Sequence, residues 1–365
     1  EASLTVSNMT IAKALVGTSA NGVVDTTGSE LTIGEIATYR LTVTLPESTI
    51  TNLTVVDLVP SGMRYVTNTV SVDTTGFGGT LPGVPSILTA GGDGDDVTIR
   101  FDGLTTVTDD NNGANNQFVI DLNMVVLDVP GNTGRVAGSQ TALPNSATIA
   151  FDGNPPVSTS GVVVIEVVEP RLTLDKTMRH ASNELVLIDL VVSNAGLSAA
   201  FDVVLEDTLA TNWWDTTTIT PVTVPPGFVF AVTGAPGDAV ITLSVDNGSS
   251  QPTNAIVPDQ VILFQFSAQL RAGAPSPVTN RASITEYSTL ENDDPEERLY
   301  GPVEDEVILA IPGVALSKVL LSPIGRSAGV GEVVTFAITV TNTCDIGLNP
   351  LVLVGVFIGA MMSFL

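Results

Sequence analysis

The stretch Gly34-Glu-Ile-Ala-Thr-Tyr-Arg-Leu-Thr-Val-Thr44 carries the pattern that decides the fold. Its apolar residues Tyr39, Leu41 and Val43 alternate with threonine and arginine. This period of two is typical of a β-strand with one buried and one solvent-exposed face. Threonine suits the exposed face because it is polar and also β-branched, which favours an extended backbone.

The same pattern recurs further along the chain. Residues 331–341 read Gly331-Glu-Val-Val-Thr-Phe-Ala-Ile-Thr-Val-Thr341, and a diverged copy occupies residues 185–193. A second apolar stretch follows each copy, at residues 55–63, 353–361 and 204–209. Self-similarity over so long a period indicates a tandem array of one domain type.

The spacing of the expected strands defines the fold class. Short apolar stretches recur between turn residues, without a helical period, which predicts an all-β chain of tandem immunoglobulin-like antiparallel β-sandwiches. The expected domains are residues 1–8 as the end of a preceding domain or an N-terminal strand, 9–168 as repeat one, 169–311 as repeat two, and 312–365 as a partial repeat three.

Composition supports this class and restricts the partners. Only 14% of the residues are charged, while 33 glycines and 22 prolines supply turns. The 39 acidic and 13 basic residues give a formal net charge of −26, which argues against nucleic acid or an anionic membrane as a partner. Cys344 is the single cysteine, so no intramolecular disulfide can stabilise the chain.

The last twenty residues, 346–365, carry no charge and are long enough to cross a bilayer as a helix. We do not expect a membrane span, because the repeat register aligns Leu353 with Val55 and because Pro350 and the lack of basic flanks disfavour one. The partial repeat cannot bury a core by itself. A neighbouring chain is therefore expected to complete residues 312–365, or the chain to self-associate into a fibre.

The motifs resemble a known family. They are a lysine in the first strand, the G-E-x-x-T-[YF] strand, the turn Asp57-Leu-Val-Pro60, and a late N-x-A strand at Asn145-Ser-Ala147 and Asn280-Arg-Ala282. Together they resemble the conserved repeat of bacterial surface proteins called domain of unknown function 11, and the related isopeptide-forming domains of fimbrial subunits. The resemblance implies a bacterial or archaeal envelope protein, extracellular or at the cell surface, that acts as a stalk, adhesin or filament subunit.

The resemblance also implies a chemistry, because some relatives link a lysine of the first strand to an asparagine of the last, helped by an acid. Carried over by position, the candidates are Lys13, Asp57 and Asn145 in repeat one, and Lys176, Asp207 and Asn280 in repeat two. The lysine must be neutral to attack and the acid protonated to assist, and both conditions need an apolar core. The same residues also have ordinary roles, as an edge-strand lysine, a turn aspartate and an asparagine bonded to nearby backbone.

Repeat three serves as an internal control for this interpretation. Lys318 occupies the lysine position, but Gly355 stands where repeat one has Asp57, and no asparagine partner follows in this sequence. A self-contained bond in repeat three is therefore not expected.

The acidic loops and the single histidine bear on two other kinds of site. Acid-rich loops can bind Ca²⁺, so the sequence leaves open calcium sites at Asp93, Asp95, Asp96, Asp109, Asp110, Asp293 and Asp294, although none has the spacing of a defined calcium loop. The alternative function is thus a calcium-dependent adhesive module that binds glycans or a host protein. His180, in an expected loop, is the only histidine, which argues against a catalytic Ser-His-Asp set and against a histidine metal cluster. The chain is therefore expected not to be an enzyme, and no cofactor other than Ca²⁺ is expected.

Overall fold

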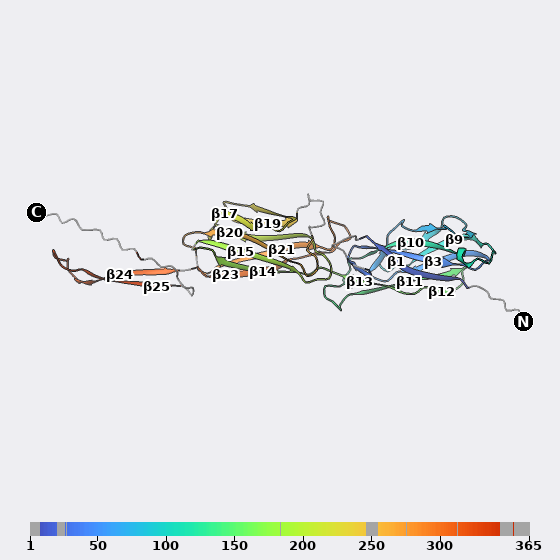
Figure 1. The fold of residues 1–365 in the computed structure, drawn as a ribbon, viewed down its shortest axis with the longest axis horizontal. Coiled ribbons are helices and arrows are strands. Elements are labelled where there is room, and N and C mark those ends of the chain that lie inside the picture. The colour runs from blue at the N-terminus through green and yellow to red at the C-terminus, as the bar shows by residue number, and fades with distance from the viewer. Residues whose placement is uncertain are drawn as a thin grey trace.

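A computed structural model describes residues 8–19, 26, 28–182, 184–245, 255–274, 276–311, 313–343 and 353. These residues form 25 β-strands and one short 3-10 helix, Gly113–Asn115. Figure 1 shows two β-sandwiches and a β-hairpin that follow one another along the long axis of the molecule. The predicted all-β class of tandem immunoglobulin-like sandwiches is confirmed.

The first sandwich consists of two facing sheets. One sheet has the order β1-β3-β10-β5, with β6 also paired to β10, and the other has the order β2-β13-β11-β4-β9-β7, with β12 on β11 and β8 on β9. All pairs are antiparallel except β13 with β2. The strands are β1 (Thr10–Thr18), β2 (Glu30–Thr32), β3 (Ile36–Thr44), β4 (Thr49–Leu58), β5 (Met63–Tyr65), β6 (Ser71–Asp73), β7 (Gly79–Thr80), β8 (Ser86–Leu88), β9 (Val97–Val107), β10 (Gln117–Val126), β11 (Ala142–Phe151), β12 (Ser158–Thr159) and β13 (Val163–Val168).

The alternation in residues 34–44 places β3 in the centre of its sheet. Tyr39, Leu41 and Val43 are fully buried between the two sheets, whereas Arg40 is exposed and pairs with Asp121 on β10. Burying the apolar face of this strand stabilises the sandwich, because each such side chain is worth about 1.5–3 kcal/mol. The predicted strand is thus confirmed.

The second sandwich repeats this plan with fewer strands. Its sheets have the orders β14-β15-β20-β17 and β18-β19-β16-β21-β22, with β23 also paired to β21. Its core includes the fully buried Trp214, Phe264 and Phe266. The strands are β14 (Leu172–His180), β15 (Leu185–Asn194), β16 (Phe201–Leu209), β17 (Trp214–Thr223), β18 (Phe228–Thr233), β19 (Ala239–Val245), β20 (Val261–Leu270), β21 (Val278–Ser288), β22 (Leu299–Tyr300) and β23 (Val303–Leu309).

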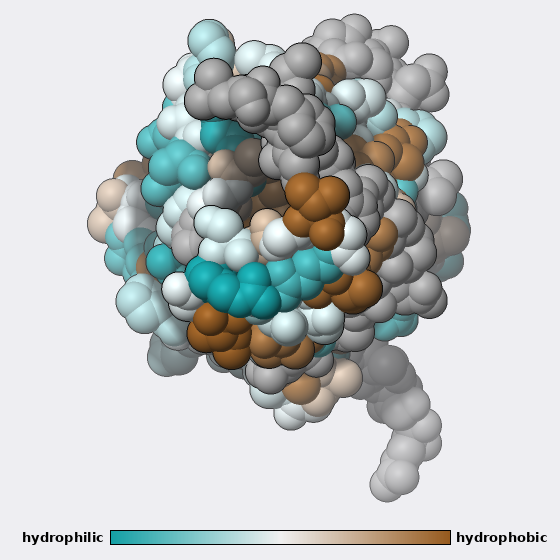
Figure 2. Space-filling view, turned by 90° about the vertical axis from the view of Figure 1, so that its left-hand side faces the viewer, coloured by the Kyte–Doolittle hydropathy of each residue, from teal (hydrophilic) through white to brown (hydrophobic). Residues whose placement is uncertain are grey.

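The last unit described is a single antiparallel hairpin of β24 (Val314–Ser322) and β25 (Thr335–Asn342). Most of its apolar side chains, among them Leu316 and Ile338, are exposed. Figure 2 looks at the molecule from this end and shows hydrophobic and hydrophilic residues side by side. Among the described residues no helix is long and apolar enough to cross a membrane, and residues 346–365 lie outside that set except for Leu353.

Candidate functional site

The candidate residues of repeat one meet between the two sheets of the first sandwich. Lys13 comes from β1 in one sheet, while Asp57 on β4 and Asn145 on β11 come from neighbouring strands of the other. Lys13 Nζ donates to Asp57 Oδ2, and both side chains are fully buried. Asn145 is also fully buried. The structure therefore brings together three polar residues that the sequence places far apart.

This first triad contains polar atoms that lack hydrogen-bond partners among the described residues. They are Asp57 Oδ1 and both polar side-chain atoms of Asn145. An unpaired buried polar group costs about 1–3 kcal/mol, so folded proteins rarely leave several together. These three atoms therefore differ from most buried polar groups, which are hydrogen-bonded.

Burial shifts the ionisation of the pair toward its neutral form. It lowers the pKa of Lys13 below its usual value, although the adjacent Asp57 acts in the opposite direction. Burial likewise raises the pKa of Asp57, with Lys13 and Asn145 opposing the shift. Both shifts follow from the cost of a charge in an apolar interior. They favour an uncharged amine and a protonated carboxyl, the two forms that acyl transfer to lysine requires.

A second triad lies at the same place in the second sandwich. Lys176 on β14 donates from Nζ to Asp207 Oδ2 on β16, and both side chains are fully buried. Asn280 on β21 donates from Nδ2 to Asp207 Oδ1 at 2.8 Å and to the Thr208 carbonyl oxygen at 2.9 Å, while Asn280 Oδ1 lacks a partner. Burial lowers the pKa of Lys176, against the pull of Asp207 and Asp305, and raises that of Asp207.

Strand register shows that the two triads occupy equivalent positions. Lys13 pairs with Leu41 and Lys176 with Leu190, each in the central strand of its sheet. In the facing sheets, Asp57 pairs with Ala147 and Asp207 with Ala282, and each alanine lies two residues after the triad asparagine. The predicted grouping of lysine, acid and asparagine thus occurs twice at equivalent positions, although only the second asparagine is hydrogen-bonded to its acid.

Two further residues adjoin the triads and were missed by the sequence reasoning. Lys13 Nζ lies 4.3 Å from the centroid of the Tyr39 ring, and burial raises the pKa of this tyrosine. In repeat two, Asp305 on β23 accepts a hydrogen bond of 2.7 Å from the backbone N–H of Lys176. Tyr39 could have been predicted, because it is the aromatic residue of the G-E-x-x-T-[YF] motif. Asp305 could not, because no sequence pattern near it indicates a contact with Lys176.

The lysine of repeat three has a partly similar setting. Lys318 Nζ lies 4.3 Å from the Phe336 ring centroid, as Lys13 does from Tyr39. Every residue of β24 is nevertheless exposed, so Lys318 is not enclosed in a core. Gly355, at the acid position, lies outside the described residues.

The acidic loops do not assemble a metal site in the part of the chain that the structure describes. No three His, Cys, Asp or Glu residues gather closely enough to hold an ion there. Several carboxylates instead accept hydrogen bonds from backbone N–H groups, namely Asp93 from Gly62, Asp95 from Gly92, Asp96 from Val59, Asp110 from Asn112, and Asp294 from Glu296. Asp109 and Asp293 lie in the same kinds of loop.

His180 was expected in a loop, and this expectation is wrong. It is the last residue of β14, because strand pairing continues as far as His180 opposite Val186. Its Nε2 atom lies 3.1 Å from the carbonyl oxygen of Ala310. The histidine therefore takes part in β-sheet structure at the end of the second sandwich.

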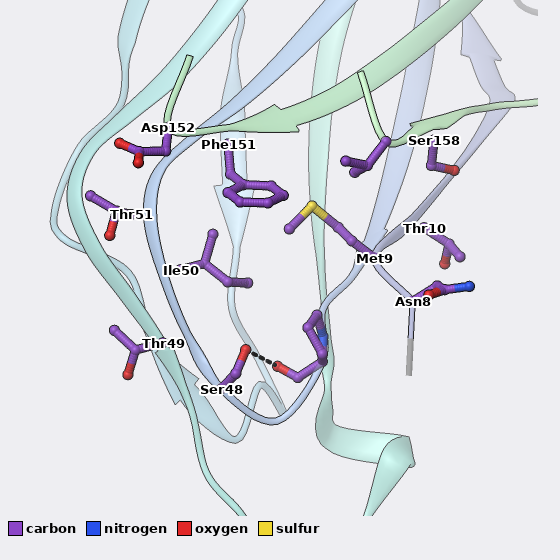
Figure 3. Close-up of a pocket in the computed structure, with 12 residues that line it drawn as sticks. Asn8, Met9, Thr10, Ser48, Thr49, Ile50, Thr51, Phe151, Asp152 and Ser158 are labelled. Carbon is purple, nitrogen blue, oxygen red and sulfur yellow. Dashed lines mark hydrogen bonds between the residues drawn. The ribbon is translucent and has the colours of Figure 1, made fainter. Parts of the chain in front are cut away.

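A hollow of about 680 Å³ lies at the outer end of the first sandwich, away from the triads. Figure 3 shows Met9, Ile50 and Phe151 pointing into it, with polar side chains such as Asp152 and Ser158 around them. No triad residue lines this hollow.

Comparisons with known proteins give structural neighbours only. No protein-family model and no curated protein matches the chain. The C-terminal domain of the Streptococcus agalactiae AgI/II polypeptide BspA is 8% identical, with 82% of this chain and 99% of that chain covered and a TM-score of 0.39. The major pilin subunit BcpA of Bacillus cereus is 12% identical (84% and 67% covered, TM-score 0.31), and the Actinomyces fimbrial adhesin FimA is 13% identical (83% and 96% covered, TM-score 0.23). With TM-scores this low, these neighbours add nothing to the functional argument, which rests on the triads.

Proposed function

We propose that the chain is a non-enzymatic structural protein of a bacterial surface, a stalk, adhesin or filament subunit, whose repeats are each closed by a Lys–Asn isopeptide bond. The domains would be repeat one at residues 9–168, repeat two at 169–311 and a partial repeat three from 312. One observation carries the proposal: a buried lysine, aspartate and asparagine meet at equivalent positions in two successive sandwiches.

The bond would form by acyl transfer within the folded core. The neutral Nζ of Lys13 attacks Cγ of Asn145, while the protonated Asp57 donates a hydrogen bond to the amide oxygen and stabilises its developing negative charge. As the attacking nitrogen passes a proton to the other oxygen of the Asp57 carboxyl, Asp57 gives its own proton to the departing amide nitrogen, so the carboxyl ends with one proton, as it began. The new Nζ–Cγ bond replaces the Cγ–Nδ2 bond, and one ammonia leaves. Lys176, Asp207 and Asn280 would act in the same way.

The geometry of repeat two supports this assignment of roles. The Asn280 amide nitrogen, which would leave as ammonia, donates a hydrogen bond of 2.8 Å to Asp207, and Lys176 donates to the other oxygen of the same carboxyl. The acid therefore contacts both the attacking and the leaving nitrogen. This placement suits a group that shuttles one proton between the attacking and leaving nitrogens.

The proposed bond would supply the covalent staple that a chain with one cysteine lacks. By analogy with disulfides, closing a loop of about 100 residues stabilises a fold by on the order of 4–5 kcal/mol. Each bond would also join the two facing sheets, since the lysine and asparagine strands belong to different sheets. A surface stalk needs this resistance to unfolding and pulling.

Peptide mapping tests the chemistry. A protease digest of the denatured chain should yield one branched peptide that joins Lys13 to Asn145 and another that joins Lys176 to Asn280. Asp57→Ala should remove only the first, and Asp207→Ala only the second. Asp121→Ala, at an exposed ion pair, is the matched control and should keep both. Linear peptides alone in the parent chain would refute the proposal.

Location is tested separately. An antibody raised against the purified chain should label intact, unpermeabilised cells of the source organism or filaments shed by them. Labelling that requires permeabilised cells would contradict a surface role, whatever the peptide map shows.

The hairpin supports a further part of the proposal, assembly into a fibre through pairing with strands of a neighbouring chain. Leu316 and Ile338 are among its exposed apolar residues. Sedimentation velocity should show concentration-dependent association that Leu316→Asp with Ile338→Asp abolishes. Association unchanged by these substitutions would remove the hairpin from the proposal.

A further inference from the structure

The two sandwiches are joined by more than the linker, residues 169–171. Residues 289–298, between β21 and β22 of the second sandwich, lie against the inner end of the first, where Figure 1 shows the two units meeting. Thr289 Oγ1 donates to the Ile33 carbonyl oxygen at 2.9 Å, and Arg64 Nη2 lies 2.5 Å from Glu296 Oε1. A Cβ added at Gly34 would lie only 2.9 Å from the Glu296 carbonyl oxygen, so the backbones pack directly.

Arg298 makes the most contacts across this boundary. Its Nε donates to Asp128 Oδ1 at 2.6 Å, and its Nη2 donates to the Val129 carbonyl oxygen at 2.6 Å. Its Nη1 donates to the Asn132 carbonyl oxygen at 2.7 Å and to Glu169 Oε1 at 2.9 Å. The side chain is 14% exposed. Acceptors from the first sandwich and the linker thus surround three sides of one guanidinium.

Glu169, at the start of the linker, is the centre of this arrangement. It is 1% exposed and also accepts hydrogen bonds from Gly134 N at 2.6 Å and Tyr300 Oη at 2.8 Å. Arg135 lies 4.5 Å from the centroid of the Tyr300 ring. A buried carboxylate is tolerated when it is paired and fully hydrogen-bonded, and removing one partner is then strongly destabilising.

We propose that residues 128–134 and Glu169 form a guanidinium-binding socket at the inner end of the first sandwich, and that its capture of Arg298 locks the two sandwiches at one fixed angle. Arginine suits this role because its planar fork of donors matches several acceptors at once, which lysine cannot do. The joint is independent of the isopeptide bonds, since those lie within each sandwich.

The socket is specific to this joint. Strand β20 of the second sandwich corresponds to β10 of the first, and their registers put Ala272 at the position of Asp128. Glu169 precedes Lys176 by the same number of residues as Ile311 precedes Lys318, so Ile311 stands at the position of Glu169. Neither Ala272 nor Ile311 can accept a hydrogen bond from a guanidinium side chain through its own side chain. The lock is therefore assigned to the first joint only, and the link between repeat two and the hairpin lacks its acidic residues.

The test measures the distance between spin labels on the two sandwiches, at Ser86→Cys and Thr223→Cys, in the full chain with Cys344→Ser. Both label sites are exposed. The parent should give one narrow distance distribution, and Arg298→Ala and Arg298→Lys should each broaden it several-fold. Arg281→Ala, which removes an exposed arginine of the second sandwich paired with Glu304, is the control and should stay narrow.

Adding methylguanidinium to Arg298→Ala should narrow the distribution again, because the small cation refills the socket; this rescue also requires both sandwiches to be folded. A broad distribution in the parent, or a narrow one in Arg298→Ala without additive, would overturn the lock. A broad distribution that methylguanidinium leaves unchanged would overturn capture of the guanidinium as its cause.

Discussion

At the scale of single residues, the pairing of Lys13 with Asp57 makes each group depend on the other. Both side chains are withdrawn from water, and burial shifts each pKa toward the uncharged form. Removing the lysine leaves a buried carboxyl with no base beside it. Its protonation should then control the stability of the first sandwich.

Lys13→Met should therefore make stability depend on pH. Burial raises the folded pKa of Asp57 above its unfolded value of about 3.9, so the carboxyl binds its proton more tightly when folded. The stabilisation that Asp57 contributes is fully present below its unfolded pKa and is lost as pH rises through its folded pKa. The free energy of unfolding should fall by at most about 1.4 kcal/mol per pH unit above pH 4.

Urea titrations of Lys13→Met at several pH values measure this slope. The double variant Lys13→Met with Asp57→Asn should show a flatter profile, because the titrating group is gone. Equal slopes in the two variants would mean that Asp57 does not titrate as its burial requires.

Asn145→Ala should show how much of the free energy of unfolding comes from the proposed bond and how much from packing of the side chain. Loss of a cross-link that closes a loop of about 130 residues should lower the free energy of unfolding by on the order of 4–5 kcal/mol. Asn123→Ala, on the half-buried face of β10, should cost far less. Thermal unfolding of the two variants beside the parent checks this, and similar losses for both would argue against a bond at Asn145.

At the scale of the elements, the proposed bonds connect strands that carry force. Lys13 lies near the start of repeat one, and Asn145 lies near its end, on β11, after which only β12 and β13 follow. Under tension between the ends of the repeat, force would pass from β1 through the bond to β11. The strands between them would bear no load.

Single-molecule pulling should then release little length from repeat one. A bond would shield about 130 residues, or ~450 Å of extended chain, and leave about 25 residues to unravel. Lys13→Ala, which cannot form the bond, should release the full length of repeat one in a longer extension step. A long step in the parent chain would contradict a bond that bridges β1 and β11.

The sequence predicts most of these elements but not all of their contacts. Alternation of apolar residues is a local property, so β3 and its buried Tyr39, Leu41 and Val43 follow directly from residues 34–44. The triad residues follow only from the resemblance to isopeptide-forming domains, because no local pattern connects strands so far apart in the sequence. Asp305 and the Arg298 socket were missed, since they depend on strand pairing and docking that no local pattern encodes.

At the scale of the whole molecule, stability would come from covalent staples and a locked joint rather than from bound metal. The acidic loops use several of their carboxylates to accept hydrogen bonds from their own backbone. EDTA should therefore leave the thermal unfolding midpoint unchanged. A midpoint that falls on chelation and recovers with added Ca²⁺ would instead support the calcium-dependent adhesive module.

The intact mass of the denatured chain tests the central claim most directly. The account predicts a mass lower than that of the sequence by two ammonia molecules. Lys13→Ala and Lys176→Ala should each restore one ammonia relative to its own sequence mass, and the double variant both. A parent chain whose mass equals that of its sequence would contradict the isopeptide bonds and leave two ordinary sandwiches held by their cores and their joint.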